Sequence, residues 1–286
     1  MSDGPMYDWA EPGPPAPALQ EKPHFGHAAL FFLVALPLLA AGQYLSLAIA
    51  HALPVYRHKS YSHLVHVMAS DARLGIPAQA LAYLLVGLVT VLLFRLLWRE
   101  PFSIGIHWNG QQAQRRFLSL VVIGLLVGFG NTIIGNYLPM PKDPPILMDM
   151  MKSPGGAWLM LVFGITAAPL LEELAFRGFL LPGFVNTFRW LMHKDDISRS
   201  TLNWVGIPVS ILLTSLPFAM LHAGQVSGAW GPLLLIGGVS VVLCVVRLLT
   251  DSLAASAVVH AAYNFTLFAG ILIQTDGFRH LGKLKG

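Results

Sequence analysis

Seven long apolar stretches constrain this chain more than any other feature. They cover approximately Phe25–Leu53, Ala78–Trp98, Phe117–Leu138, Ala157–Leu181, Gly206–His222, Gly231–Thr250 and Leu253–Ile273. A helix that crosses a membrane needs about 20 mostly apolar residues, and most of these stretches reach that length. Only 11% of the residues are charged, whereas an average soluble protein has roughly 25%. The sequence therefore predicts an all-α, multi-pass integral membrane protein and excludes a soluble globular domain.

The number of spans depends on one ambiguous segment. Leu181 to His193 is apolar but short and contains Pro182 and Gly183. It could lie in the membrane interface, re-enter the bilayer, or cross it as an eighth span. We therefore expect a helical bundle of about seven or eight transmembrane helices. If the source is bacterial, its location would be the cell or inner membrane.

The chain divides into four regions. We expect residues 1–24, rich in proline and acidic side chains, to form a disordered tail. Residues 25–150 should form transmembrane helices and loops, residues 155–270 a second helical domain, and residues 274–286 a short tail. A net charge of +4 is too small and scattered to indicate a nucleic-acid partner. The single cysteine, Cys244, excludes an internal disulfide and a zinc site made of thiolates.

Three ionisable residues fall within one apolar stretch. Glu172, Glu173 and Arg177 would each cost about 2.5–3.5 kcal/mol at the centre of a membrane helix if left unpaired. Glu173 and Arg177 are four residues apart and share a helix face, so we predict a bidentate ion pair between them. Glu172 is turned by about 100° from Glu173 and pairs less well with the arginine. An incompletely compensated carboxylate suits a group that must accept and release a proton.

Polar side chains also occur in two later stretches. His222 ends one of them, four residues after Phe218, and His260 stands four residues before Asn264. The spacing places His260 and Asn264 on one helix face. A single histidine in a membrane helix is commonly a packing residue. Polar groups on three separate spans, however, would all lower their desolvation cost by facing one another. We therefore predict a common polar cavity inside the membrane.

The motifs, taken in order, resemble those of a known family. They are Glu172-Glu173-x-x-x-Arg177, Phe218-x-x-x-His222 and His260-x-x-x-Asn264. The ordered set is similar to that of the intramembrane CAAX prenyl protease type 2 family. This is the Abi or CPBP group, which includes the lysostaphin-resistance-protein-A-like proteins. The resemblance covers roughly residues 157–268, and the earlier part of the chain carries no such motif.

The resemblance implies an intramembrane endopeptidase that acts on a membrane-associated protein or peptide. Glu172 would be the general base that activates water, and His222 would hold or polarise that water. His260 and Asn264 would form the oxyanion site. These roles agree with the chemistry of the residues, because a water nucleophile needs a proton acceptor and the tetrahedral intermediate needs preplaced donors.

The resemblance also assigns supporting roles and leaves the metal question open. Glu173 and Arg177 would support the catalytic residues, and Phe218 would pack the neighbouring imidazole. A zinc ion is possible, because three of the residues could act as ligands: Glu172, His222 and His260. No His-Glu-x-x-His pattern is present, and an asparagine beside His260 suits hydrogen bonding better than zinc ligation, so a mechanism without a metal is favoured.

Two other functions remain open. The same glutamate and histidines could form a proton or ion relay in a transporter, since such groups are the usual parts of relays. A family member without catalytic activity could instead act in bacteriocin immunity. Internal symmetry would favour transport, whereas one cavity that holds Glu172, His222, His260 and Asn264 would favour proteolysis.

Overall fold

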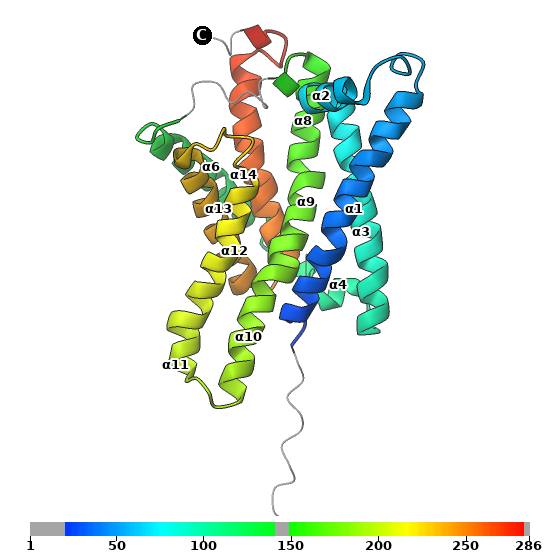
Figure 1. Cartoon of the computed structure of the whole chain (residues 1–286). Helices are drawn as coiled ribbons and strands as arrows, with labels where there is room; N and C mark the ends of the chain where they lie inside the picture. Colours follow the sequence, from blue (N-terminus) through cyan, green and yellow to red (C-terminus); the bar gives the residue numbers. More distant parts are fainter. Residues whose placement is uncertain (1–20, 141–148, 283–286) are drawn as a thin grey trace, which may run out of the picture.

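The structure, a computed structural model, describes residues 21–140 and 149–282, and within these ranges it contains helices and no strands. Seven helical runs are long and apolar enough to cross a membrane, which confirms the predicted all-α multi-pass bundle (Figure 1). The chain is an integral membrane protein. Residues 1–20 and 283–286, in the two predicted tails, and residues 141–148 lie outside the described residues.

The described helical elements follow one another along the chain. Their bounds are α1 (Phe25–Ala52), α2 (Tyr61–Ser70), α3 (Ala72–Trp98), α4 (Phe102–Gly105), α5 (Gly110–Arg115), α6 (Phe117–Gly135), α8 (Pro154–Ile165), α9 (Ala167–Glu173), η1 (Leu174–Leu180), α10 (Leu181–His193), α11 (Arg199–Thr201), η2 (Leu202–Gly206), α12 (Ile207–Leu221), α13 (Trp230–Thr250) and α14 (Leu253–Gln274). The two η elements are π-helical, with wider turns than an α-helix. Such turns occur frequently at functional sites.

The fourth spanning run covers 40 residues, Pro154–His193, and consists of α8, α9, η1 and α10. It is interrupted at Thr166, where φ is −124° and ψ is −87°. Pro169, three residues later, has no N–H to bond the carbonyl of Ile165. At 1.5 Å per residue the run is about 60 Å long, twice the hydrocarbon thickness of about 30 Å. The sequence alone allowed Leu181–His193 to lie in the interface, to re-enter the bilayer or to cross it as an eighth span. In the structure this segment is the last third of the fourth run and not a separate span.

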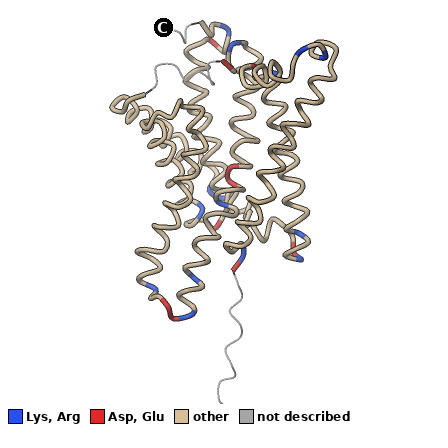
Figure 2. Tube along the Cα trace, in the orientation of Figure 1, with Lys and Arg blue, Asp and Glu red and all other residues tan. Residues whose placement is uncertain are grey.

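Charged residues lie mainly at the two ends of the bundle (Figure 2). A small charged group lies inside the bundle instead, and it includes the fully buried side chains of Glu173 and Arg177. Arg247 on α13 is also buried, with 5% of its surface exposed. This distribution fits a bilayer around the middle of the bundle, because charges there need partners within the protein.

Helices α6 and α14 approach each other closely through glycines. Gly124 and Gly128 on α6 are spaced four apart, the Gly-x-x-x-Gly pattern that lets membrane helices pack backbone to backbone. A Cβ atom on Gly124 would lie 2.5 Å from the carbonyl oxygen of Val259, and one on Gly128 would lie 2.6 Å from Cβ of Thr266. Val259 directly precedes His260, so this close contact sets the position of that histidine in the bundle.

We expect Gly124→Ala to lower the free energy of unfolding by about 1–3 kcal/mol, because the added methyl group meets backbone atoms of α14 that cannot move away freely. Thermal unfolding of the purified protein in detergent measures this change. Gly130→Ala on the same helix is the matched control, since a Cβ there has no atom within 4 Å. Equal unfolding temperatures for the two variants would contradict the close approach of α6 and α14.

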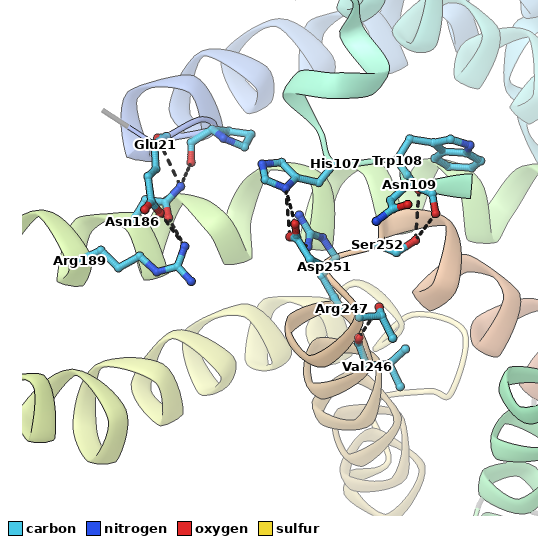
Figure 3. Close-up of polar contacts among 12 residues, drawn as sticks. Glu21, His107, Trp108, Asn109, Asn186, Arg189, Val246, Arg247, Asp251 and Ser252 are labelled. Carbon is cyan, nitrogen blue, oxygen red and sulfur yellow. Dashed lines mark hydrogen bonds and ion pairs between the residues drawn. The ribbon is translucent and has the colours of Figure 1, made fainter. Parts of the chain in front are cut away.

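The start of α14 is tied to the loop formed by residues 106–109 (Figure 3). His107 Nδ1 lies 3.0 Å from the carboxylate of Asp251, which also accepts a hydrogen bond of 2.9 Å from Arg247. Ser252 Oγ donates to two carbonyl groups of the same loop, at 2.9 and 3.2 Å. These contacts fix the first turn of the helix that carries the third polar motif.

The segment before α1 is held against α10 in the same region (Figure 3). Asn186 Nδ2 donates to the carbonyl of Pro23 at 2.9 Å, and Arg189 forms an ion pair of 2.6 Å with Glu21. Residues 21–24 of the predicted tail therefore contact the fourth spanning run.

The pKa of Asp251 gives a pH-dependent prediction. Burial alone would raise the pKa of this carboxyl, but hydrogen bonds from His107 and Arg247 more than offset burial and lower the pKa. Because the folded-state pKa is the lower one, the stabilisation is complete above the unfolded-state pKa of about 3.9 and is lost as the pH falls below it. We expect Asp251→Asn to lower the unfolding temperature near neutral pH, and the difference from wild type to disappear well below pH ~4.

Thermal unfolding as a function of pH tests this expectation. Asp276→Asn is the control, because the Asp276 side chain is as exposed as that of Asp251, 66% against 68%, but lies 3.9 Å from its histidine neighbour, which is too long for a hydrogen bond. A difference between Asp251→Asn and wild type that stays constant over the whole pH range would show that the carboxylate charge does not stabilise the turn.

Candidate functional site

One cavity of about 1250 Å³ lies inside the bundle, and residues from all three motifs line it. The motif residues on its wall are Glu172 on α9, Phe218 and His222 at the end of α12, and His260 and Asn264 on α14. Most other wall residues are apolar, so these polar groups face an otherwise hydrophobic space. The structure thus brings together the four residues that the sequence assigned to catalysis.

The buried ion pair lies directly behind the cavity wall. Arg177 Nη1 lies 3.0 Å from Glu173 Oε1, and both side chains are almost entirely excluded from solvent. The predicted pair is confirmed, but it is not bidentate: Glu173 Oε2 and Arg177 Nε have no hydrogen-bond partner among the described residues. Arg177 Nη2 instead donates to the carbonyl and hydroxyl oxygens of Ser240 on α13, at 2.9 and 2.6 Å. The arginine therefore joins the fourth run to α13.

His260 lies between the two carboxylates. Its Nδ1 is 2.9 Å from Glu173 Oε1, and its Nε2 is 3.6 Å from Glu172 Oε2. The four-residue spacing indicates that His260 lies beside Asn264, but it carries no sign of the contact with Glu173. Because the carboxylate accepts the proton on Nδ1, Glu173 fixes the orientation of the ring and leaves Nε2 facing the cavity.

His222 is held by the backbone of its own helix. Its Nδ1 lies 2.9 Å from the carbonyl oxygen of Phe218. A carbonyl can only accept, so Nδ1 carries the proton and Nε2 of the neutral ring is a free acceptor. The ring of Phe218 lies 5.0 Å from the ring of His222 and 5.8 Å from that of His260, with the guanidinium of Arg177 4.5 Å away. The Phe218 ring therefore contacts the imidazoles of both His222 and His260.

Asn264 connects α14 to the interruption in the fourth run. Its Nδ2 donates to the carbonyl of Gly164 at 2.7 Å. Gly164 lies just before the irregular residue Thr166, near the position where Pro169 removes a backbone donor. The side chain of Asn264 thus satisfies a backbone group of the fourth run, and its second N–H and its Oδ1 have no partner among the described residues.

The possible metal ligands do not form a coordination site. Among the described residues, no three histidine, cysteine, aspartate or glutamate side chains are grouped closely enough to hold a metal ion. Nδ1 of each histidine is engaged, one by Glu173 and the other by a backbone carbonyl. Histidines that bind a metal through Nε2 make the same kind of hydrogen bond through Nδ1, so it is the spacing of Glu172, His222 and His260, and not their hydrogen bonding, that does not fit a three-ligand zinc centre in this structure.

The first half of the chain supplies cavity walls that the motifs do not indicate. Gln43 on α1, Gln79 and Tyr83 on α3, and Asn131 on α6 all line the same cavity as Glu172. The sequence does indicate the three amides, because an amide side chain inside an apolar span has a desolvation cost that only a polar partner offsets.

Comparison with known proteins agrees with the motif resemblance. Residues 154–266 match the family model described as type II CAAX prenyl endopeptidase Rce1-like. No curated protein matches the chain, and no solved structure matches it. The matched region contains all seven residues of the three motifs, and it confirms the predicted similarity to CAAX proteases over this part of the chain.

Proposed function

We propose, from the similarity of residues 154–266 to type II CAAX prenyl endopeptidases, that this protein is an intramembrane endopeptidase. Its substrate would be a membrane-associated protein or peptide. The observation that carries the proposal is that Glu172, His222, His260 and Asn264 all line one cavity. A relay for ions needs a path to both sides of the membrane, whereas hydrolysis needs these groups around one reacting carbonyl.

Glu172 is the general base in this proposal. It takes a proton from a water molecule as the water oxygen attacks the carbonyl carbon of the scissile peptide bond. His222, with Nε2 free as an acceptor, orients the second proton of that water. When the carbon–nitrogen bond breaks, Glu172 returns the proton to the leaving amine. No step requires a further reactant.

Asn264 and His260 stabilise the negative oxygen of the tetrahedral intermediate. Asn264 has one N–H engaged by Gly164 and a second N–H available. A His260 ring that carries a proton on Nε2 as well as on Nδ1 donates to the oxyanion, and the carboxylate of Glu173, 2.9 Å from Nδ1, stabilises its positive charge while Glu172 holds the proton of the water. Preplaced donors of this kind in a largely apolar site contribute strongly to catalysis.

A comparison of protein termini tests the function in cells. Membrane proteins from cells that carry the wild type and from cells that carry Glu172→Ala are compared by mass spectrometry of their amino and carboxyl termini. New termini present only with the wild type identify substrates and cleavage positions. Identical termini in both, at equal protein levels, would contradict an endopeptidase function in those cells.

A chelator titration of the purified, active protein tests the metal question separately. We expect activity to be unchanged after the chelator is added and removed, because the side chains do not form a ligand set. Loss of activity that zinc restores would show instead that Glu172, His222 and His260 rearrange around a metal ion.

A further inference from the structure

We propose that the cavity wall formed by α1 and α3 binds the main chain of an extended peptide. The inference rests on the proposed endopeptidase function and adds the subsite that holds the substrate next to Glu172. Three polar side chains mark this wall: Gln43 on α1, and Gln79 and Tyr83 on α3. None of them belongs to the region matched by the family model.

The two glutamines form an amide pair with unused capacity. Gln43 Nε2 donates to Gln79 Oε1 at 2.8 Å, and the pair is only partly buried because it faces the cavity. A carboxamide has two donor hydrogens and two acceptor lone pairs. The carbonyl oxygen of Gln43 has no hydrogen-bond partner within the part of the chain that the structure describes. Both residues lie in spanning helices, where free polar groups are costly, so a polar ligand in the cavity would satisfy them.

The spacing along α3 matches that of an extended peptide. Gln79 and Tyr83 are four residues apart, so their positions repeat at about 6 Å along the helix axis. Main-chain groups that point to one side of an extended chain repeat every two residues, at about 6.6 Å. Tyr83 and Glu172 line the same cavity, and α3 packs against α9, which carries Glu172. An extended segment bound along Gln43, Gln79 and Tyr83 would therefore lead toward the catalytic glutamate.

The other walls fit the side chains of a variable peptide. Four methionines line the same cavity, from α2, the segments after α6 and before α8, and α8 itself: Met68, Met140, Met150 and Met160. Methionine adapts to differently shaped apolar groups. An aliphatic chain would leave the carbonyl oxygen of Gln43 without a partner, whereas a peptide supplies both donors and acceptors. The wall thus favours an extended peptide with mixed apolar side chains.

The test uses quenched-fluorescent octapeptides of mixed apolar sequence with lysines at both ends. In the best-cleaved member, each main-chain N–H within four residues of the cleaved bond is methylated in turn. We expect one methylation to lower kcat/KM by about tenfold with the wild-type enzyme, because it removes the hydrogen bond to the Gln43 oxygen. The same methylation should have little effect with Gln43→Leu.

Variants of the wall give a second measurement. We expect Gln43→Leu and Gln79→Leu each to raise KM by about five- to tenfold with kcat nearly unchanged. The matched control is Gln111→Leu on α5, an exposed glutamine that does not line the cavity. A KM that is unchanged or lower in both wall variants would overturn the inference, as would an absence of any position sensitive to methylation.

The outcomes separate this inference from the proposed function. If the leucine variants fail to fold, the methylation series with the wild type decides alone. Cleavage by the Glu172→Ala variant would contradict the proposed endopeptidase mechanism. It would not bear on whether the α1 and α3 wall binds the peptide main chain. Where turnover is too slow to measure, binding of the methylated and unmethylated peptides to wild-type protein, followed by fluorescence anisotropy, gives the same comparison without chemistry.

Discussion

Glu172→Ala is expected to reduce kcat for peptide cleavage by about a hundredfold to ten-thousandfold, the usual contribution of a positioned general base. The fold should survive, because Glu172 is partly exposed to the cavity and its nearest ionic contact, with His260, is long at 3.6 Å. His260 keeps its hydrogen bond to Glu173 when Glu172 is removed. The measurement is steady-state cleavage of a peptide by purified protein with a normal unfolding temperature.

Two further variants make the result specific. Glu172→Gln keeps the size of the side chain but accepts no proton, so it should be as inactive as the alanine variant. Glu100→Ala removes a carboxylate at the end of the bundle, where Glu100 lies 3.5 Å from Lys22, and should retain full activity. Cleavage at the wild-type rate by well-folded Glu172→Ala protein would remove the basis for the proposed mechanism.

Arg177→Ala is expected to destabilise the protein by about 3–5 kcal/mol, the range for removing one partner of a buried ion pair. The substitution leaves the carboxylate of Glu173, which has no exposed surface, without its cation. It also removes both hydrogen bonds to Ser240 on α13. The free energy of unfolding and the yield of folded protein in detergent measure the effect.

An exposed ion pair provides the control for Arg177. Arg73 contacts Asp71 at 2.7 Å, but its side chain is 65% exposed. Arg73→Ala should change the free energy of unfolding by no more than about 1 kcal/mol. Arg177→Lys, which keeps the charge but not the planar donors, should fall between the two. A similar small effect for Arg73→Ala and Arg177→Ala would show that the interior pair contributes little.

Much of this architecture could be predicted from local patterns. Apolar length alone gave the seven spans, because the bilayer fixes how long a spanning helix must be. The Glu173–Arg177 pair followed from helix geometry, since both partners lie on one element. The position of Phe218 against His222 followed from the same four-residue spacing. These features depend on residues close together in the chain.

Contacts between distant elements could not be predicted in this way. The π-helical turns in residues 174–180 have no recognised signal in composition, and they alter the side-chain directions that an α-helix would give. The hydrogen bond from His260 to Glu173 depends on how α14 packs against the fourth run. That packing depends in turn on Gly124. Its four-residue spacing from Gly128 indicates that α6 packs closely against another helix, but it does not say which helix that is.

The buried ion pair also has a consequence for the order of synthesis. Ser240 lies 63 residues after Arg177, and His260 lies 87 residues after Glu173, so neither exists when the fourth span leaves the ribosome. The Glu173–Arg177 contact is formed within one helix and is the first of these contacts available during membrane insertion. The four-residue spacing therefore neutralises this span for entry into the bilayer, and the later helices then enclose the same charges behind the cavity wall.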